Sequence, residues 1–296
     1  MPLSARLLGT ALPLWHWAAS RTVAAAPGHL RRNWPWERVR VPDDCWEQLA
    51  DAFVDGAYAT VKGRVRTYVL HEQLLRHLPA PPATVLDVGG GAAHQSLPLA
   101  RLGYEVTLVD PSAAMLAKAT QRLAAEPDQV QRRVRLIQAA GENAPKAVDG
   151  ERFNAVLCHG VLMYLAQPDP MVDSLCRCLL PGGLISIMAL NAQTLALRPA
   201  LERRWNDALA AFDASGELGV LGAKTRADTV DGLSELLRRA QVDPVAWYGV
   251  WLFVDWLELP LESTDVKAVA EVELQASLRD PYRQLSRVFH LIGRKP

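Results

Sequence analysis

Two acidic residues and a run of three glycines, all within one short stretch, have the types and spacing needed to bind a nucleoside. Asp87 stands two positions before the glycines at 89–91, and Asp110 ends the next apolar run. Glycine lacks Cβ, so such a run can turn sharply and let a ligand approach the backbone closely. A carboxylate at the end of the second run can accept hydrogen bonds from both ribose hydroxyls. The stretch therefore predicts a nucleoside site in which Asp87 binds an ammonium group or orients the glycine loop.

The elements that must position these residues are two strands and a helix of an α/β unit. The apolar run at 84–88 predicts a buried parallel strand, a helical pattern follows at 97–102, and 106–109 predicts a second strand. Ligands of such sheets bind at the carboxyl ends of the strands. Dinucleotide-binding loops read GxGxxG, whereas this loop has Ala93 where many keep a third glycine. Its DxGxG form resembles motif I of the class I S-adenosylmethionine (SAM) methyltransferases, which implies a SAM site.

The rest of the chain completes one large α/β domain. Parallel strands are expected at 134–138, 153–158 and 184–190, and an antiparallel edge hairpin at 245–254 and 285–292. Helices are expected at 168–180, at 229–240, in two pieces at 46–78, and from a Ser112 cap to about residue 125. The fold class is therefore α/β, with a Rossmann-like seven-stranded class I methyltransferase sheet, N-terminal helices and a helical lid insertion at about 192–226.

Length and composition limit the classes of function. The chain has 296 residues, half of them apolar, and no net charge, so no overall field recruits nucleic acid and no DNA partner is expected. No apolar run reaches the roughly 20 residues of a membrane span. The four cysteines contain no CxxC pair, so no metal site is predicted. We expect a cytoplasmic enzyme without a membrane partner, with its methyltransferase domain at 46–296 and a poorly ordered N-terminal extension at 1–45.

Four segments of the chain carry a more specific likeness. They are YATVKGRVR at 58–66, VLDVGGG at 85–91, CHGVL at 158–162 with LPGG at 180–183, and DPYRQLSRVFH at 280–290. With these segments the chain resembles, over about 46–296, the bacterial tRNA 5-carboxymethoxyuridine methyltransferases, which use SAM to methylate the carboxylate of a modified wobble uridine. The resemblance implies a set of residues that contact SAM, and the spacing of the glycine loop adds Asp87 and Gly91 to this set. The implied contacts are Arg66, Gly89, Gly90, Asp110, Gly141, Glu142 and His159.

A basic pair before the core strand supports one of these contacts independently. Lys62 and Arg66 are four residues apart in a helical pattern, so they share one face of the helix. A cation at that place can hold the carboxylate of the SAM methionine portion through a charge-assisted hydrogen bond. A solvated basic helix face is the alternative for this segment.

The sequence defines the acceptor less closely. The segment HGVL at 159–162 follows the fourth strand, where many amino methyltransferases have an Asn/Asp-Pro-Pro-aromatic motif. This difference favours O-methylation of a carboxylate or hydroxyl. A carboxylate acceptor needs no general base, and no catalytic residue is assigned. The insertion reads GELGVLGAK at 216–224 where the family carries a lysine run, so both a small molecule and a tRNA remain as acceptors. The candidate acceptor contacts are Asn191, Arg198, Tyr282 and Arg287.

Two other classes of protein stay open on the sequence alone. A non-catalytic SAM-binding protein would have the same features, because every residue identified binds the cofactor. A dinucleotide-dependent oxidoreductase is disfavoured by the DxGxG loop. Binding of SAM or of NAD distinguishes the oxidoreductase from the other two classes.

Overall fold

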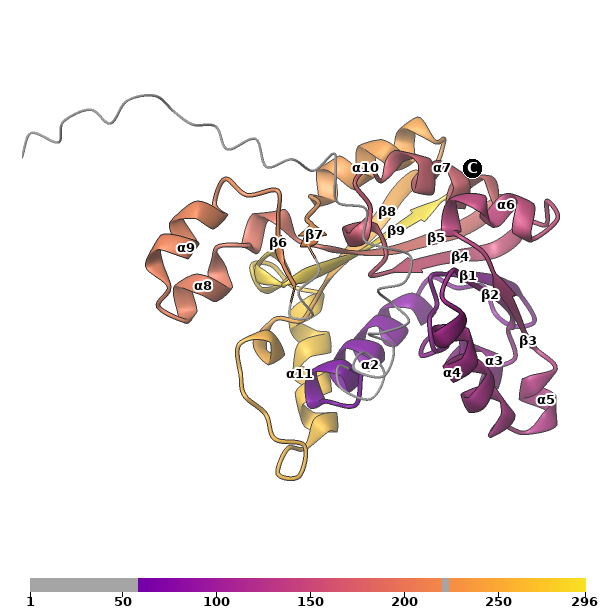
Figure 1. The fold of residues 1–296 in the computed structure, drawn as a ribbon, viewed down its shortest axis with the longest axis horizontal. Helices are drawn as coiled ribbons and strands as arrows, with labels where there is room; N and C mark the ends of the chain where they lie inside the picture. Colours follow the sequence, from indigo (N-terminus) through magenta and orange to yellow (C-terminus); the bar gives the residue numbers. More distant parts are fainter. Residues whose placement is uncertain (1–57, 220–223) are drawn as a thin grey trace, which may run out of the picture. The chain divides into compact units, whose positions relative to one another are not determined.

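A seven-stranded sheet in the order β3-β2-β1-β4-β5-β9-β8 organises the computed structural model, which describes residues 58–219 and 224–296 (Figure 1). The first five strands pair in parallel, whereas β9 lies antiparallel between β5 and β8. This order confirms the predicted fold class, including the antiparallel edge pair. The strands are β1 (Thr84–Val88), β2 (Glu105–Asp110), β3 (Val134–Gln138), β4 (Phe153–His159), β5 (Leu179–Leu190), β8 (Asp243–Val250) and β9 (Val288–Arg294).

Helices cover both faces of this sheet, and a separate group of short elements forms the insertion. The insertion, called the lid below, contains α8 (Leu197–Leu201), α9 (Trp205–Ala211) and a hairpin of β6 (Gly216–Leu218) with β7 (Lys224–Arg226). Figure 1 shows α2 and α11 side by side, and their apolar residues share one core cluster. The other helices are α2 (Val61–Leu75), α3 (Ser96–Arg101), α4 (Ala113–Ala124), α5 (Asp128–Gln131), α6 (Ala144–Ala147), α7 (Asp169–Arg177), α10 (Val230–Arg239) and α11 (Val266–Ser277).

Three helices begin at a hydroxyl side chain that accepts a hydrogen bond from the first turn. Thr60 Oγ1 accepts from Gly63 N before α2, and Thr229 Oγ1 accepts from the first turn of α10. Ser112 Oγ accepts from Met115 N, which confirms the predicted cap of α4. Such a cap stabilises a helix by about 1 kcal/mol because the first N–H groups have no partner within the helix.

The core is divided by the alternation of side chains along the strands. Val85 of β1 packs on one face with Leu74 of α2 and Leu99 of α3. Leu86, the next residue, packs on the other face with helices α7 and α10. Because both faces of the central strands are buried, these strands are mostly apolar, with Thr107 and Ser186 as buried polar exceptions, and further polar residues stand at their carboxyl ends. The polar residues of the predicted site therefore emerge together at one edge of the sheet.

Some element boundaries differ from the sequence predictions. Strand β8 ends at Val250 rather than 254 because Trp251 has φ +61°, which turns the chain out of the extended conformation. Strand β9 begins at Val288 because Tyr282–Leu285 forms a 3₁₀ turn, η7. The second half of the lid is a hairpin rather than a loop. The predicted extension at 1–45 and the first of the two N-terminal helices lie outside the described residues. None of the described helices is long and apolar enough to cross a membrane.

Candidate functional site

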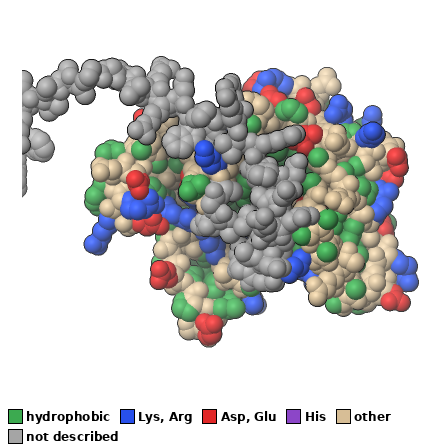
Figure 2. All heavy atoms as spheres, viewed as in Figure 1, with side chains coloured by type: hydrophobic (Ala, Val, Ile, Leu, Met, Phe, Trp, Pro, Cys, Tyr) green, Lys and Arg blue, Asp and Glu red, His purple; other side chains and the backbone are tan. Residues whose placement is uncertain are grey.

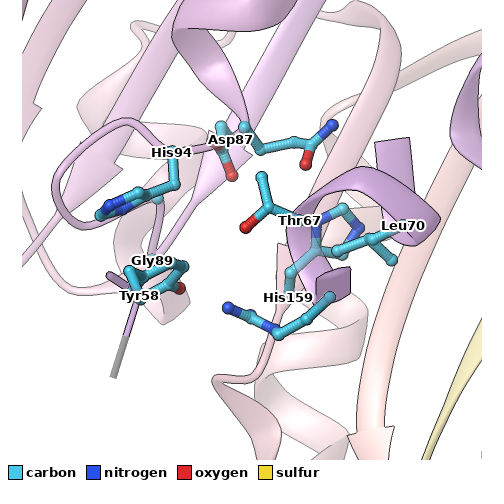
Figure 3. A pocket seen from close by; sticks show the side chains of 10 residues that line it. Tyr58, Thr67, Leu70, Asp87, Gly89, His94 and His159 are labelled. Atoms are coloured by element: carbon cyan, nitrogen blue, oxygen red, sulfur yellow. The ribbon is translucent and has the colours of Figure 1, made fainter. Parts of the chain in front are cut away.

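An open cleft of about 350 Å³ lies at the carboxyl ends of β1 and β4. Figure 3 shows its lining side chains, which come from three places: the turn before α2 and the middle of that helix, the end of β1 and the loop after it, and the end of β4. The cleft thus brings together elements that are distant in sequence, as expected for a parallel sheet that binds ligands at this edge. The lining residues are Tyr58, Arg66, Thr67, Leu70, Asp87, Gly89, Gly90, His94, Gln95 and His159.

The glycine loop has a backbone conformation that side chains would oppose. Gly89 has φ +70° and Gly91 has φ +53°, both in the left-handed region that favours glycine. At Gly90 a Cβ would lie 2.7 Å from Asp87 Oδ2, so the loop is packed directly against that carboxylate. The glycines are therefore required both for the turn and for its close packing beside the cleft.

The carboxylate of Asp87 is buried under the glycine loop. Ser96 Oγ donates to Asp87 Oδ2 at 2.6 Å, and the residue is only 2% exposed. Burial raises the pKa of Asp87 to about 6, although the hydrogen bond from Ser96 acts in the opposite direction. A cation bound beside this carboxylate would relieve the cost of its burial. Asp87 is therefore suited to bind an ammonium group.

Asp110 is held by two backbone N–H groups at the end of β2. Gly91 N donates to Oδ2 and Ser112 N donates to Oδ1, each at 2.9 Å. Burial raises the pKa of Asp110, and these two hydrogen bonds act against that rise. Each carboxylate oxygen has a second lone pair that can accept from a ligand hydroxyl. Asp110 does not line the cleft itself but fixes the loop that does.

The two cations that the sequence placed on one helix face have different partners. Arg66 is 8% exposed, its guanidinium lies 5.0 Å from the Tyr58 ring centroid, and its Nε has no hydrogen-bond partner among the described residues. Lys62 instead forms an ion pair with Asp255. Arg66 thus faces the cleft with an unused donor, which suits it to bind a carboxylate.

His159 lies at the end of β4, opposite the glycine loop. Its Nε2 is 2.7 Å from Ser186 Oγ, whereas its buried Nδ1 has no hydrogen-bond partner among the described residues. Burial, together with the nearby charge of Arg66, lowers the pKa of His159 to about 3. The ring is therefore neutral at physiological pH.

A stacked pair of rings at the cleft was missed by the reasoning from sequence. His94 stacks on Tyr58 with the ring centroids 3.7 Å apart and the planes 11° from parallel. Burial lowers the pKa of His94 to about 3, so that ring is also neutral. Tyr58 belongs to the conspicuous segment at 58–66, which was the available signal, whereas nothing in the sequence pointed to His94.

Four of the predicted cofactor contacts are not part of the cleft lining: Gly91 and Asp110, described above, and Gly141 and Glu142. Gly141 begins a 3₁₀ turn, η3 (Gly141–Asn143), directly after β3, and its carbonyl accepts from Ser174 Oγ at 2.9 Å. A Cβ at Gly141 would lie 2.7 Å from Val88 Cγ1, so glycine is needed there for packing. Glu142 is exposed. Their role toward a cofactor stays a prediction.

Two of the predicted acceptor contacts do not present a free side chain to a cleft: the Asn191 amide is hydrogen-bonded within the protein, and the Tyr282 side chain is exposed at the surface. Asn191 Oδ1 accepts from Gln193 N at 3.1 Å, and its Nδ2 donates to Ser286 O at 3.0 Å, so this buried amide joins the end of β5 to the approach to β9. These contacts give Asn191 a capping role. Tyr282 is 47% exposed and lies near the ring of Phe253.

The other two acceptor candidates belong to a group of charges at the base of the lid, called the basic cluster below. Figure 2 shows hydrophobic, basic and acidic side chains intermixed on the lid helices α8 and α9. Arg198 and Lys62 both pair with Asp255, whose side chain is fully buried. Arg287 pairs with Glu217 of the lid hairpin, while its buried Nη1 has no hydrogen-bond partner among the described residues. Three cations thus share two anions through direct ion pairs.

Asp255 is expected to hold the lid in place. Asp255→Asn leaves two cations without their buried anion, and we expect it to lower the free energy of unfolding by about 2–3 kcal/mol, less than for a fully buried pair because both cations are partly exposed. Urea denaturation measures this change, and limited proteolysis should show faster cleavage within 192–226. Asp207→Asn is the matched control, since Asp207 pairs with Arg204 on the surface and should cost under about 0.5 kcal/mol. Equal effects of the two substitutions would contradict this role.

Comparison with known proteins agrees with the fold and with the predicted class of enzyme. A family model described as a methyltransferase domain matches residues 86–185. The chain is 28% identical over 258 residues to the tRNA 5-carboxymethoxyuridine methyltransferase of Escherichia coli O157:H7, with 86% of this chain and 97% of that protein covered. It is 34% identical to a ubiquinone biosynthesis O-methyltransferase of Methylobacterium nodulans, but over only 39% of this chain and 44% of that protein.

Solved structures show the same fold at low identity. A putative methyltransferase in complex with the Haloferax volcanii activator Trm112 superposes with a TM-score of 0.56 at 18% identity, over 87% of this chain and 99% of that one. The glycopeptide N-methyltransferase MtfA with S-adenosylhomocysteine gives a TM-score of 0.52 at 16% identity, over 78% and 90% of the two chains. The fold and the relatives together define a class I SAM-dependent methyltransferase. Among such enzymes it resembles the tRNA 5-carboxymethoxyuridine methyltransferases over most of its length, as the sequence motifs predicted.

Proposed function

We propose that this enzyme transfers the methyl group of SAM to a carboxylate oxygen, and that the carboxylate belongs to a modified wobble uridine of tRNA. The observation that carries the proposal is the similarity to the tRNA 5-carboxymethoxyuridine methyltransferases, which covers 86% of this chain and 97% of those proteins and so extends well beyond the SAM core. The basic cluster supports an acidic acceptor, because Arg287 Nη1 has no hydrogen-bond partner among the described residues and a carboxylate can accept from it.

The cofactor half of the proposal assigns one chemical task to each group at the cleft. Arg66 binds the carboxylate of the SAM methionine portion, and Asp87 binds its ammonium group together with His159. Asp110 accepts from the ribose hydroxyls, while the backbone of residues 89–91 lets the nucleoside approach closely. Gly141 and Glu142, after β3, meet the adenine edge.

The acceptor half needs little proton chemistry. Bound SAM would supply an electrophilic methyl group. The carboxylate oxygen forms the new C–O bond by in-line displacement as the C–S bond of the sulfonium breaks, S-adenosylhomocysteine is the leaving group, and no proton has to leave. The enzyme's contribution is then alignment and exclusion of water, which together can supply an effective molarity of about 10⁵ M or more. Arg287 and Arg198 of the basic cluster orient the carboxylate, and the lid closes the site over it. The proposal includes the cytoplasm as the place where the enzyme meets SAM and tRNA.

A small acidic molecule is the second candidate acceptor. The chain has no net charge, and the lid hairpin contributes few cations that could contact phosphates. Against this candidate, the lid displays large exposed aromatic side chains, Trp205 at 63% and Phe212 at 75%, on which bases can stack. These surfaces favour the tRNA acceptor.

The experiment is methyl transfer from labelled SAM into an extract of cells lacking this gene, with and without nuclease. The proposal predicts label that becomes small and soluble on nuclease treatment and that is released by mild base, as expected for a carboxyl ester of RNA. Label in small molecules that nuclease does not affect would show that the acceptor is a metabolite rather than tRNA. Base-stable label in RNA would contradict a carboxylate as the acceptor group.

A further inference from the structure

A chain of four polar side chains runs inward from the cleft through the middle of the sheet. His159 Nε2 lies 2.7 Å from Ser186 Oγ of β5, which lies 2.7 Å from His290 Nε2 of β9. His290 Nδ1 lies 2.8 Å from Gln73 Oε1 of α2. Ser186, His290 and Gln73 are each 0% exposed. We call these four side chains the relay.

The far end of the relay fixes the direction of every hydrogen bond in it. Gln73 Nε2 donates to the carbonyl of Gly249 at 2.9 Å, and a carbonyl can only accept, so Gln73 Oε1 must face His290. His290 therefore carries its proton on Nδ1 and accepts at Nε2. The hydroxyl that meets this Nε2 must donate to it, so its oxygen accepts from His159 Nε2.

Both rings must be neutral for this order to hold, and their surroundings keep them so. Burial is the main cause that lowers the pKa of His159 to about 3, and it places the pKa of His290 well below its ordinary value. The titratable groups around His290 include the Tyr248 ring, 6.0 Å away, and His159 and His77, whose charges would also oppose its protonation. Each ring therefore has one proton, and the two rings carry it on opposite nitrogens.

We propose that Ser186, His290 and Gln73 are positioning residues that hold His159 with its proton on Nε2, so that Nδ1 presents a lone pair to a hydrogen-bond donor of the bound cofactor. Nδ1 is the buried atom of His159 without a partner among the described residues. In the same cleft Arg66 Nε is an unused donor and Asp87 an acceptor. The protein thus offers one donor and two acceptors, which complement the carboxylate and the ammonium group of an amino acid. The cofactor group that donates to His159 Nδ1 is therefore the ammonium group of SAM. This inference rests on the proposed cofactor contacts but not on the acceptor.

The first test reads the tautomers directly in the full-length protein without ligand. Nitrogen NMR of histidine-labelled protein distinguishes protonated from unprotonated ring nitrogens, and His159→Gln and His290→Gln variants assign the signals. At neutral pH the relay predicts a proton on Nε2 of His159 and on Nδ1 of His290. The same nitrogen protonated in both rings, or a positive charge on either, would overturn the relay. This result depends on neither SAM nor the acceptor.

The second test asks whether the buried residues act on the cofactor through His159. Gln73→Met removes the acceptor that sets the direction of the relay, and we expect mixed tautomers at His159 and about tenfold weaker binding of S-adenosylhomocysteine by titration calorimetry. Ser186→Ala should weaken binding similarly, and Ser186→Thr, which keeps the hydroxyl, should restore it. Ser277→Ala removes a buried hydroxyl whose one hydrogen bond among the described residues is to the Leu274 carbonyl, and it should leave binding within about twofold.

The outcomes of this second test separate a positioning role from a structural one. If Gln73→Met leaves the His159 tautomer and the affinity unchanged, the positioning role is refuted. If Ser277→Ala weakens binding as much as Ser186→Ala, the effect is general loss of packing and the role is also refuted. Normal binding by the unmodified protein together with no methyl transfer would count against the proposed acceptor alone.

Discussion

Gly89→Ala is expected to weaken SAM binding at least about a hundredfold and to remove methyl transfer with it. Gly89 has φ +70°, where an alanine costs roughly 1–2 kcal/mol, and the new Cβ would overlap Val161 Cγ2. The chain relieves both problems by moving the loop, and the loop backbone is the surface that the cofactor must approach. Titration calorimetry with SAM measures the loss.

Gly150→Ala is the matched control for this substitution. Gly150 has a similar φ of +77°, but a Cβ there meets nothing within 4 Å. It should therefore lose a similar amount of stability from the backbone strain and bind SAM normally. If both variants bind SAM as the unmodified protein does, the glycine loop is not the cofactor site.

Asp87→Asn is expected to stabilise the ligand-free protein while it weakens SAM binding. The pKa of Asp87 is about 6 in the folded protein against an ordinary 3.8, so burying its charge costs roughly 2–3 kcal/mol at pH 7. Asparagine has nearly the same shape and can still accept from Ser96. The variant therefore avoids the free-energy cost of burying a charge, but it also lacks the negative charge that would bind an ammonium group.

The pH dependence of this effect has a definite sign. Between about pH 4 and pH 6 the folded protein binds a proton at Asp87 that the unfolded chain releases, so the stability that Asp87 contributes falls as pH rises. The difference in unfolding free energy between Asp87→Asn and the unmodified protein should be small near pH 4 and reach roughly 2–3 kcal/mol at pH 7. Urea denaturation at the two pH values measures it. A variant less stable at pH 7 than the unmodified protein would contradict the account.

Much of the fold and the centre of the site could be predicted because the signals are local. The apolar run before Asp87, the glycines at 89–91 and the acid at the end of β2 all lie within one βαβ unit, where strand, turn and helix follow each other in sequence. The cap at Ser112 depends only on the neighbouring turn. Such features require no knowledge of distant partners.

The features that could not be predicted depend on partners far away in the sequence. Lys62 and Arg66 look equivalent on their helix, but Asp255, 193 residues from Lys62, pairs with only one of them. The sequence suggested Asn191 as a substrate contact, but in the structure its side-chain amide donates a hydrogen bond to the backbone carbonyl of Ser286. The relay joins four elements, and no spacing rule brings Gln73 and His290 together.

The most direct test of the account is a parallel titration of the full-length protein with SAM and with NAD, repeated for Asp110→Ala. The account predicts one SAM bound per chain, no NAD bound, and SAM binding at least about tenfold weaker without the Asp110 carboxylate, because the ribose hydroxyls and the glycine loop both lose an acceptor. Binding of NAD without SAM would point to a dinucleotide enzyme. SAM binding unchanged in Asp110→Ala would place the cofactor elsewhere, and either result would contradict the account.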